Sequence, residues 1–189
     1  MNILGIIASS TLAAAGDFES IATVSVGGGG AANVEFTSIP ATYTHLQIRG
    51  LGRSSGSGSV DFAKMQFNND TTSNYATHYL YGTGASALAT AFSSSAYIYQ
   101  DLYAGAAANA SVFSGFVIDI LDYRNTNKNK TIRMLSGWDN NGVSNNGNIA
   151  LQSGLWFKTP EAITSLKLTM NNGSFVQYSH FALYGIKSS

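Results

Sequence analysis

Hydrophobic and polar residues alternate with a period of two wherever the chain shows a regular pattern. In Thr44–Leu51, Leu46 and Ile48 lie on one side and the residues between them are polar. Because successive side chains of a strand point to opposite faces of a sheet, this alternation predicts a half-buried β-strand. The same pattern recurs in Ala63–Phe67, Ile149–Leu151 and Ser165–Met170.

Another segment, Val112–Leu121, is apolar on both sides. Apart from a glycine, only Ser114 and Asp119 interrupt its apolar character. A strand of this composition is typical of the centre of a sheet that is covered on both faces. We expect the Asp119 carboxylate to accept hydrogen bonds from the backbone or from an arginine, because a lone buried carboxylate is costly.

Turn-forming residues separate these segments at short intervals. The clusters are Gly27–Gly30, Ser54–Ser59, Asn125–Lys130, Asn140–Gly147 and Asn171–Gly173. This spacing is typical of a sandwich or barrel, and only Ala104–Ala110 suggests a helical turn. We therefore predict an all-β fold: an antiparallel β-sandwich, of jelly-roll architecture, with about ten strands in a single domain over residues 18–189.

The first residues of the sequence form a separate apolar segment. Ile3, Leu4, Ile6 and Ile7 lie close together, and Ala13–Ala15 follow. A cleaved signal peptide looks similar, but no Lys or Arg precedes this apolar run, which is short. It is also far below the roughly 20 apolar residues of a membrane span, so no membrane insertion is predicted. We favour a short extended arm over residues 1–17 that docks onto a partner through these four side chains.

Charge excludes some partners. Charged residues make up only 11% of the 189 residues, and ten basic residues balance ten acidic ones. No basic stripe is available for nucleic acid, so no nucleic-acid partner is predicted. The chain has no cysteine, and His45, His78 and His180 lack the spacing of metal ligands. We predict neither a metal site nor a cofactor.

Two stretches match catalytic motifs in letters only. Gly52–Gly56 fits the nucleophile elbow of hydrolases, and Gly82–Ala87 resembles the start of a dinucleotide fingerprint. Both motifs need a helix directly after the turn, to support an oxyanion hole or to receive a pyrophosphate. A Gly/Ser tract and a strand-like pattern follow instead. We interpret both stretches as loops and predict that the protein is not an enzyme.

The stretch Gly137–Asn148, "GWDNNGVSNNGN", is rich in asparagine and glycine. Asn-Gly steps are suited to turns with positive φ, so the stretch predicts a hairpin connection between strands near Lys130–Ser136 and Asn148–Phe157. The alternative is an exposed recognition loop. There Trp138 would stack on a sugar, while Asp139, Asn140 and Asn141 would bind its hydroxyl groups.

Phe67–Gly82 has a similar composition. Its candidate recognition residues are Asn68, Asn69, Asp70 and Tyr75. Tyr- and Asn-rich loops on a rigid β scaffold form adaptable binding surfaces, although such tracts more often serve only as solvated loops. Downstream, a cluster of aromatic residues exceeds what one core needs, and we expect part of it to pack against other copies of the chain, in a homotrimer. These residues are Tyr79, Tyr81, Phe92, Tyr97, Tyr99 and Tyr103.

Three long stretches resemble a family of small virion-associated, tail-fibre-like proteins of tailed bacteriophages. They are Phe18–Gly50, Val117–Gly142 and Ala162–Lys187, and an N-terminal "LGIIAS" segment is a further point of likeness. The resemblance covers most of the chain. It implies a structural protein of the particle and no catalytic residue.

This resemblance and the composition lead to one functional hypothesis. We expect a bacteriophage virion structural protein on the surface of the extracellular particle, in the role of a fibre or spike tip that contacts the host surface, with a host surface glycan as a candidate partner. A capsid cement or decoration protein is the first alternative. A secreted glycan-binding module is the second. Other virion proteins would bind the N-terminal arm.

Overall fold

The computed structural model describes residues 17–141 and 147–187. Within these ranges the chain forms twelve β-strands and no helix. The strands are β1 (Phe18–Ser25), β2 (Asn33–Phe36), β3 (His45–Gly52), β4 (Val60–Phe67), β5 (Tyr75–Gly82), β6 (Ala87–Ser95), β7 (Ile98–Ala104), β8 (Ser114–Leu121), β9 (Lys130–Asp139), β10 (Gly147–Trp156), β11 (Leu166–Met170) and β12 (His180–Ile186).

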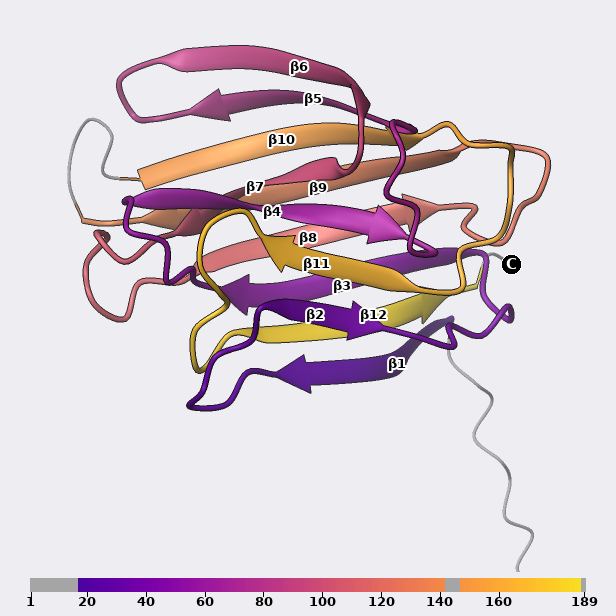
Figure 1. Cartoon of the computed structure of the whole chain (residues 1–189), viewed down its shortest axis with the longest axis horizontal. Coiled ribbons are helices and arrows are strands. Elements are labelled where there is room, and N and C mark those ends of the chain that lie inside the picture. The colour runs from indigo at the N-terminus through magenta and orange to yellow at the C-terminus, as the bar shows by residue number, and fades with distance from the viewer. Residues whose placement is uncertain (1–16, 142–146, 188–189) are drawn as a thin grey trace, which may run out of the picture.

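The strands form two antiparallel sheets of unequal width (Figure 1). The larger sheet has eight strands in the order β1-β12-β3-β8-β9-β10-β5-β6, and the smaller has four in the order β2-β11-β4-β7. The predicted all-β antiparallel sandwich is confirmed. The expected number of strands, about ten, was too low, because β2 is very short and β5 lies in the Asn- and Tyr-rich stretch that suggested a loop.

Eight of the strands alternate between the two sheets as the chain proceeds. When the pairs β5–β6 and β9–β10 are set aside, β1-β12-β3-β8 faces β2-β11-β4-β7, and every step along the chain changes sheet except the one from β4 to its neighbour β7. Sheets of four strands linked in this alternating way are the arrangement of a jelly roll. The jelly-roll architecture stays a prediction within the confirmed class, and this strand order favours it.

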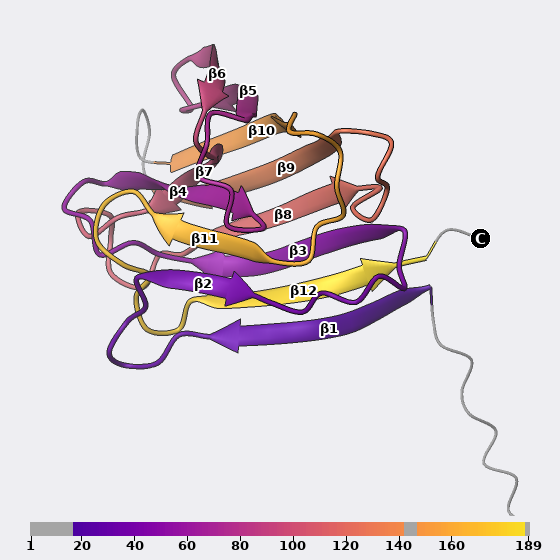
Figure 2. The same ribbon diagram turned by 45° about the vertical axis from the view of Figure 1, so that its right-hand side comes forward.

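The two remaining pairs extend the larger sheet beyond the smaller one. β9 continues the sheet from β8, β10 follows, and β5 and β6 add to the free side of β10. We call β9, β10, β5 and β6 the extension. Figure 2 shows the smaller sheet in front of the larger sheet and β6 at its far edge. Of the smaller sheet, β7 packs against β9, β10 and β5.

The core lies between the sheets. Alternate residues of each strand point inward and form one cluster of buried side chains, which includes Leu46, Ile48, Met65, Phe67, Ile118, Ile120, Leu166 and Leu168. Each fully buried side chain of this size contributes about 1.5–3 kcal/mol from the removal of apolar surface from water. A smaller cluster under the extension consists of Leu102, Ala104, Ala108, Trp138 and Ala150.

One expectation about burial is wrong. β8 was expected to be covered on both faces, but only its inner side chains are buried, and Leu121 on the outer face is 36% exposed. Asp119 also lies on this outer face, where it accepts hydrogen bonds from Gln47 (2.7 Å) and Arg133 (3.0 Å). The apolar outer residues of β8 therefore lack the second layer that their composition indicates.

Close contact between β3 and its neighbours leads to a prediction. A Cβ atom at Gly50 would lie 2.5 Å from the carbonyl oxygen of His180 and 2.5 Å from the ring of Phe116. Gly50→Ala should therefore destabilise the protein by about 1–3 kcal/mol. Thermal unfolding followed by circular dichroism measures this. In the control Gly115→Ala the new Cβ would be 3.7 Å from a Leu51 methyl group, and the melting temperature should not change. Equal melting of both variants would contradict the packing.

Candidate functional site

The outer face of the extension, together with the end of β3, carries large aliphatic side chains that no part of the described chain covers. They are Leu51, Leu80, Leu135, Ile149 and Leu151, each between 51% and 61% exposed, and we call them the outer apolar patch. Four strands bring this patch together, because Leu135 pairs with Leu151 and Leu151 pairs with Leu80. Val117 of β8 continues the row beside Leu135.

The sequence pattern had suggested the opposite orientation for β10. Ile149 and Leu151 alternate with smaller residues, so they were expected to face the core. In the structure Ala150 and Gln152 face inward and are buried, whereas Ile149 and Leu151 face outward. Alternation shows which residues share a face, but not which face is covered. The outer apolar patch was missed for this reason.

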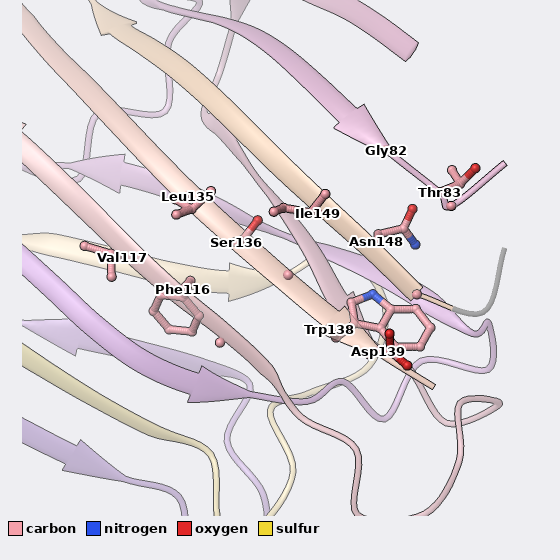
Figure 3. A pocket seen from close by; sticks show the side chains of 14 residues that line it. Gly82, Thr83, Phe116, Val117, Leu135, Ser136, Trp138, Asp139, Asn148 and Ile149 are labelled. Carbon is pink, nitrogen blue, oxygen red and sulfur yellow. The ribbon is translucent and has the colours of Figure 1, made fainter. Parts of the chain in front are cut away.

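A row of glycines forms a groove next to the patch. Gly115 pairs with Gly137, Gly137 pairs with Ile149, and Ile149 pairs with Gly82, so three of four neighbouring positions lack a side chain. The groove has a volume of about 580 Å³. Figure 3 shows Leu135 and Ile149 on adjacent strands, Val117 one strand farther, and Trp138 and Asp139 at the end of β9.

Two of the three glycines leave free space in this groove, whereas a Cβ atom at Gly137 would lie 3.0 Å from the backbone carbonyl oxygen of Asn148. A Cβ atom at Gly115 or Gly82 would meet only the methyl groups of Leu51 or Ile149, at 3.7 and 3.6 Å. These are ordinary van der Waals contacts, so the backbone is not forced to carry glycine there by a close neighbour. The missing side chains therefore leave a recess for side chains from elsewhere.

Paired charges border the apolar area on one side. In the next row of the sheet Gln47 pairs with Asp119 and Asp119 pairs with Arg133. The Arg49 side chain donates a hydrogen bond to Gln47 (2.6 Å), and Asp119 binds both Gln47 and Arg133 as described above. The expectation that an arginine would satisfy Asp119 is confirmed. An apolar ligand therefore fits only the patch and the glycine row.

Trp138 is not the exposed stacking residue of the recognition hypothesis. It belongs to β9, is 7% exposed, and packs in the smaller buried cluster with Leu102 and Ala150. Even-numbered residues of β9 face the smaller sheet. Because β9 continues past Trp138 to Asp139, the side chain of Trp138 points inward like that of Ser136. The surface placement of Trp138 was therefore wrong.

The residues after Trp138 have the contacts of a turn. Asp139 accepts a hydrogen bond from the backbone N–H of Asn141 (2.6 Å), and Asn141 has φ of 54°. Asn140 accepts one from the backbone N–H of Asn109 (2.7 Å). Since β9 and β10 pair antiparallel on either side, the hairpin interpretation is confirmed. Recognition by the exposed Asp139 and Asn141 stays a prediction.

The second Asn-rich stretch is also largely structural. Asn68 and Asn69 have φ of 49° and 55° in the turn after β4. The side-chain Oδ1 of Asn68 accepts hydrogen bonds from the backbone N–H groups of Thr164 (2.8 Å) and Ser165 (3.1 Å), so it ties this turn to the segment before β11. Only Asn69 remains exposed, and its role in recognition stays a prediction.

Asp70 and Tyr75 are buried, at 8% and 0% exposure, so their expected surface location was wrong. The Asp70 carboxylate accepts hydrogen bonds from Trp156 Nε1 (2.8 Å), Asn74 Nδ2 (2.8 Å) and the Thr72 backbone N–H (3.0 Å). Burial alone would raise the pKa of Asp70, but these hydrogen bonds outweigh it and hold the pKa well below its usual value. The Tyr75 hydroxyl donates to the Asp70 carbonyl oxygen (3.0 Å).

An aromatic groove lies on the other side of the extension. It has a volume of about 350 Å³, and Tyr79, Tyr81, Leu88 and Val60 line it. A row of ring contacts leads away from it, from Tyr79 to Phe92 (6.1 Å) and from Phe92 to Tyr99 (4.0 Å). The predicted aromatic surface therefore exists in part.

Tyr103 does not belong to that surface. It is buried between the sheets, where its ring contacts Phe116 (5.6 Å) and Phe175 (5.8 Å). Its expected contribution to an interface was wrong, because it faces inward from β7.

Both catalytic-looking motifs form loops. The Ser54 hydroxyl of Gly52–Gly56 donates a hydrogen bond to the Asp61 carboxylate (2.7 Å), and the chain then continues to β4. Gly82–Ala87 forms the turn of the β5–β6 hairpin. The backbone N–H of Thr83 donates a hydrogen bond to the backbone carbonyl oxygen of Ser86 (3.0 Å) and closes this turn. Over the described ranges, His, Asp and Glu residues form no group of three suited to a metal ion.

The arm residues Ile3, Leu4, Ile6 and Ile7 lie outside the described residues, and β1 begins at Phe18. Over residues 17–141 and 147–187 no helix is long and apolar enough to cross a membrane. Comparison with known proteins finds no family model, no curated sequence and no solved structure that matches the chain.

The Asp70 contacts predict how stability depends on pH. A carboxyl group whose pKa is lower in the folded chain stabilises the fold above its unfolded pKa of about 3.9, and this contribution is lost as the pH falls below that value. Asp70→Asn should lower the free energy of unfolding at pH 7 by about 1.5–3 kcal/mol. Between pH 5 and pH 3 the variant should lose less stability than the wild type. Urea unfolding across this range measures both effects. Glu35→Gln, on the exposed side of β2, is the control and should follow the wild type.

The burial of Trp138 gives a second prediction. Trp138→Ala should destabilise the protein by about 3–5 kcal/mol, because a buried ring is lost and a cavity remains. Leu135→Ala, on the outward side of the same strand, should change stability by less than about 1 kcal/mol. Thermal melting compares the two variants. A Trp138 variant that melts like the wild type but no longer binds host cells would instead support the recognition loop.

Proposed function

We propose that the chain is a structural protein of a bacteriophage particle, displayed on its surface and assembled through the outer apolar patch. The observation that carries this proposal is the patch itself. A large contiguous exposed apolar surface marks a site of interaction with another protein, a membrane or a ligand. Leu80, Leu135 and Leu151 lie in one row across three neighbouring strands.

The composition supports an assembled protein. Charged residues, which keep proteins soluble and apart, make up only 11% of the chain. The outer face of β8 has the apolar character of a covered strand, yet no second layer formed by the described residues covers it. Packing against another subunit would supply that layer. We propose a homo-oligomer, with a trimer favoured by the resemblance to fibre proteins.

Within the particle we propose the position of a fibre or spike tip that contacts the host surface. The aromatic groove supports this role, since Tyr79 and Tyr81 can stack on the apolar face of a sugar. Thr83 and Asn148 at the same groove offer hydrogen bonds to hydroxyl groups. Tyr79 and Tyr81 alternate with the outward-facing Leu80 along β5 and so point to the opposite face. Thr83 and Asn148, in contrast, line both grooves. Assembly through the outer apolar patch would leave the two tyrosine rings accessible.

The test is to locate the chain on purified particles. Antibodies against the purified protein, coupled to gold, are applied to phage particles from a culture that produces the chain and viewed by electron microscopy. Labelling at the tail tip is expected. Labelling over the capsid faces would instead establish the alternative, a cement or decoration protein. Particles that lack the chain altogether, by labelling and by mass spectrometry, would refute the virion proposal.

A further inference from the structure

We propose that the groove of one copy receives the apolar N-terminal segment of another copy of the same chain. This inference rests on the proposed function, because it names the partner of the outer apolar patch. Ile3, Leu4, Ile6 and Ile7 would lie over the glycine row, against Leu135 and Ile149. The proposal concerns residues of one chain and a surface of the next, and it implies nothing about the host.

The two surfaces match in chemistry. Met1–Gly16 contains no charged side chain, and it carries four large aliphatic residues within five positions. The groove combines exposed aliphatic walls with a floor of Gly82, Gly115 and Gly137. The missing side chains leave recesses for branched residues, which fill such space better than a flat sheet surface allows. Burying four aliphatic side chains would contribute several kcal/mol.

Distance decides between the same chain and a second copy. The arm leaves the sheet at Phe18, which pairs with Ile186, and Ile186 pairs with His45. Leu51 lies on the same strand as His45 and in the same row of the sheet as Ile149 of the groove, so the groove is about 20 Å from His45 along the strands. Across the sheet, Ile149 is five strand spacings from Phe18, which is about 24 Å. The direct distance is therefore about 30 Å.

A segment docked on its own chain would have to be almost fully stretched. The ten residues from Ala8 to Asp17 span at most about 33–36 Å, whereas their root-mean-square length as a flexible chain is only about 16–19 Å. A connection held near its limit gives a low effective concentration of the tethered segment. A second copy whose Phe18 lies closer to the groove avoids this cost. We therefore assign the groove to a neighbouring copy.

Such an exchange also explains how an oligomer would close. The donor surface (the arm) and the acceptor surface (the groove) differ, so each copy can give one arm and receive another. Contacts of this heterologous kind form rings when the rotation between subunits closes. A three-membered ring fits the homotrimer of the proposed function.

The chain has no cysteine, so engineered cysteines report on this contact directly. An affinity-tagged full-length chain with Ile6→Cys is co-expressed with an untagged chain with Ile149→Cys and oxidised. The cross-linked pair is then measured on a non-reducing gel. The control replaces the second variant by Asn33→Cys, which is exposed on the smaller sheet. We expect at least ten times more cross-linked pair with Ile149→Cys than with Asn33→Cys.

A third variant keeps the test independent of cysteine reactivity. Leu135→Asn, added to the Ile149→Cys chain, should reduce the cross-linking several-fold, while the exposure of Leu135 lets the protein keep its fold. Equal cross-linking to both acceptor cysteines would overturn the proposal. So would a disulfide that forms only within one chain when Ile6→Cys and Ile149→Cys are combined.

The result separates this inference from the proposed function. If light scattering finds an oligomer and particles carry the chain, but the cysteines do not cross-link, the arm proposal fails and the virion proposal stands. If the cysteines cross-link between copies but no particle contains the chain, the exchange stands and the virion proposal fails.

Discussion

The mismatch in width between the two sheets governs this structure. Four strands cannot cover eight, so the smaller sheet buries one face of the β1-β12-β3-β8 part and β7 reaches only over β9, β10 and β5. On the inner face only β6 lies beyond these strands, and its Phe92 ring stacks on Tyr99 of β7. The outer face of the larger sheet points away from the smaller sheet, so it has no second layer among the described residues, although the hydrophobic effect favours one where apolar side chains gather.

The asparagine and aspartate residues of the loops, whose composition suggests a recognition surface, hold the loops in place through hydrogen bonds. Asp70 gathers hydrogen bonds from Trp156, Asn74 and Thr72, and Asn68 holds the segment before β11. With few charges and no disulfides, the turns are fixed by asparagine and aspartate side chains bound to backbone groups. Residues that look like a binding surface in the sequence therefore stabilise the connections between strands.

Much of the fold followed from local patterns. The alternation in β3, β4 and β11 predicted strands with the correct inner residues, and the Asn-Gly steps predicted the β9–β10 hairpin. In these places the apolar residues face the core, so period and burial agree. In β10 they disagree, because Ile149 and Leu151 are larger than the inward-facing Ala150 and Gln152. No local rule shows which face a distant strand will cover.

The candidate site depends on still longer relations. The groove joins Gly82, Gly115 and Gly137 through the register of β5, β8, β9 and β10, and nothing in the sequence indicates that these three glycines lie in one row. Trp138 lies among turn-forming residues in the sequence, but β9 extends beyond it to Asp139, so the alternation of the strand directs its side chain inward. Side-chain chemistry could be anticipated from the sequence, whereas its placement required the strand order.

The composition of the extension has a consequence for how this protein could have changed over evolutionary time. β5–β6 and β9–β10 enter the chain at different points, with β7 and β8 between them, and β5 pairs with the larger sheet only through β10. Loss of the second hairpin would leave the first with no sheet to join. The dependence runs in one direction only: β9–β10 joins the sheet through β8 and could persist without β5–β6, whereas β5–β6 could have been added or kept only in a chain that already had β10.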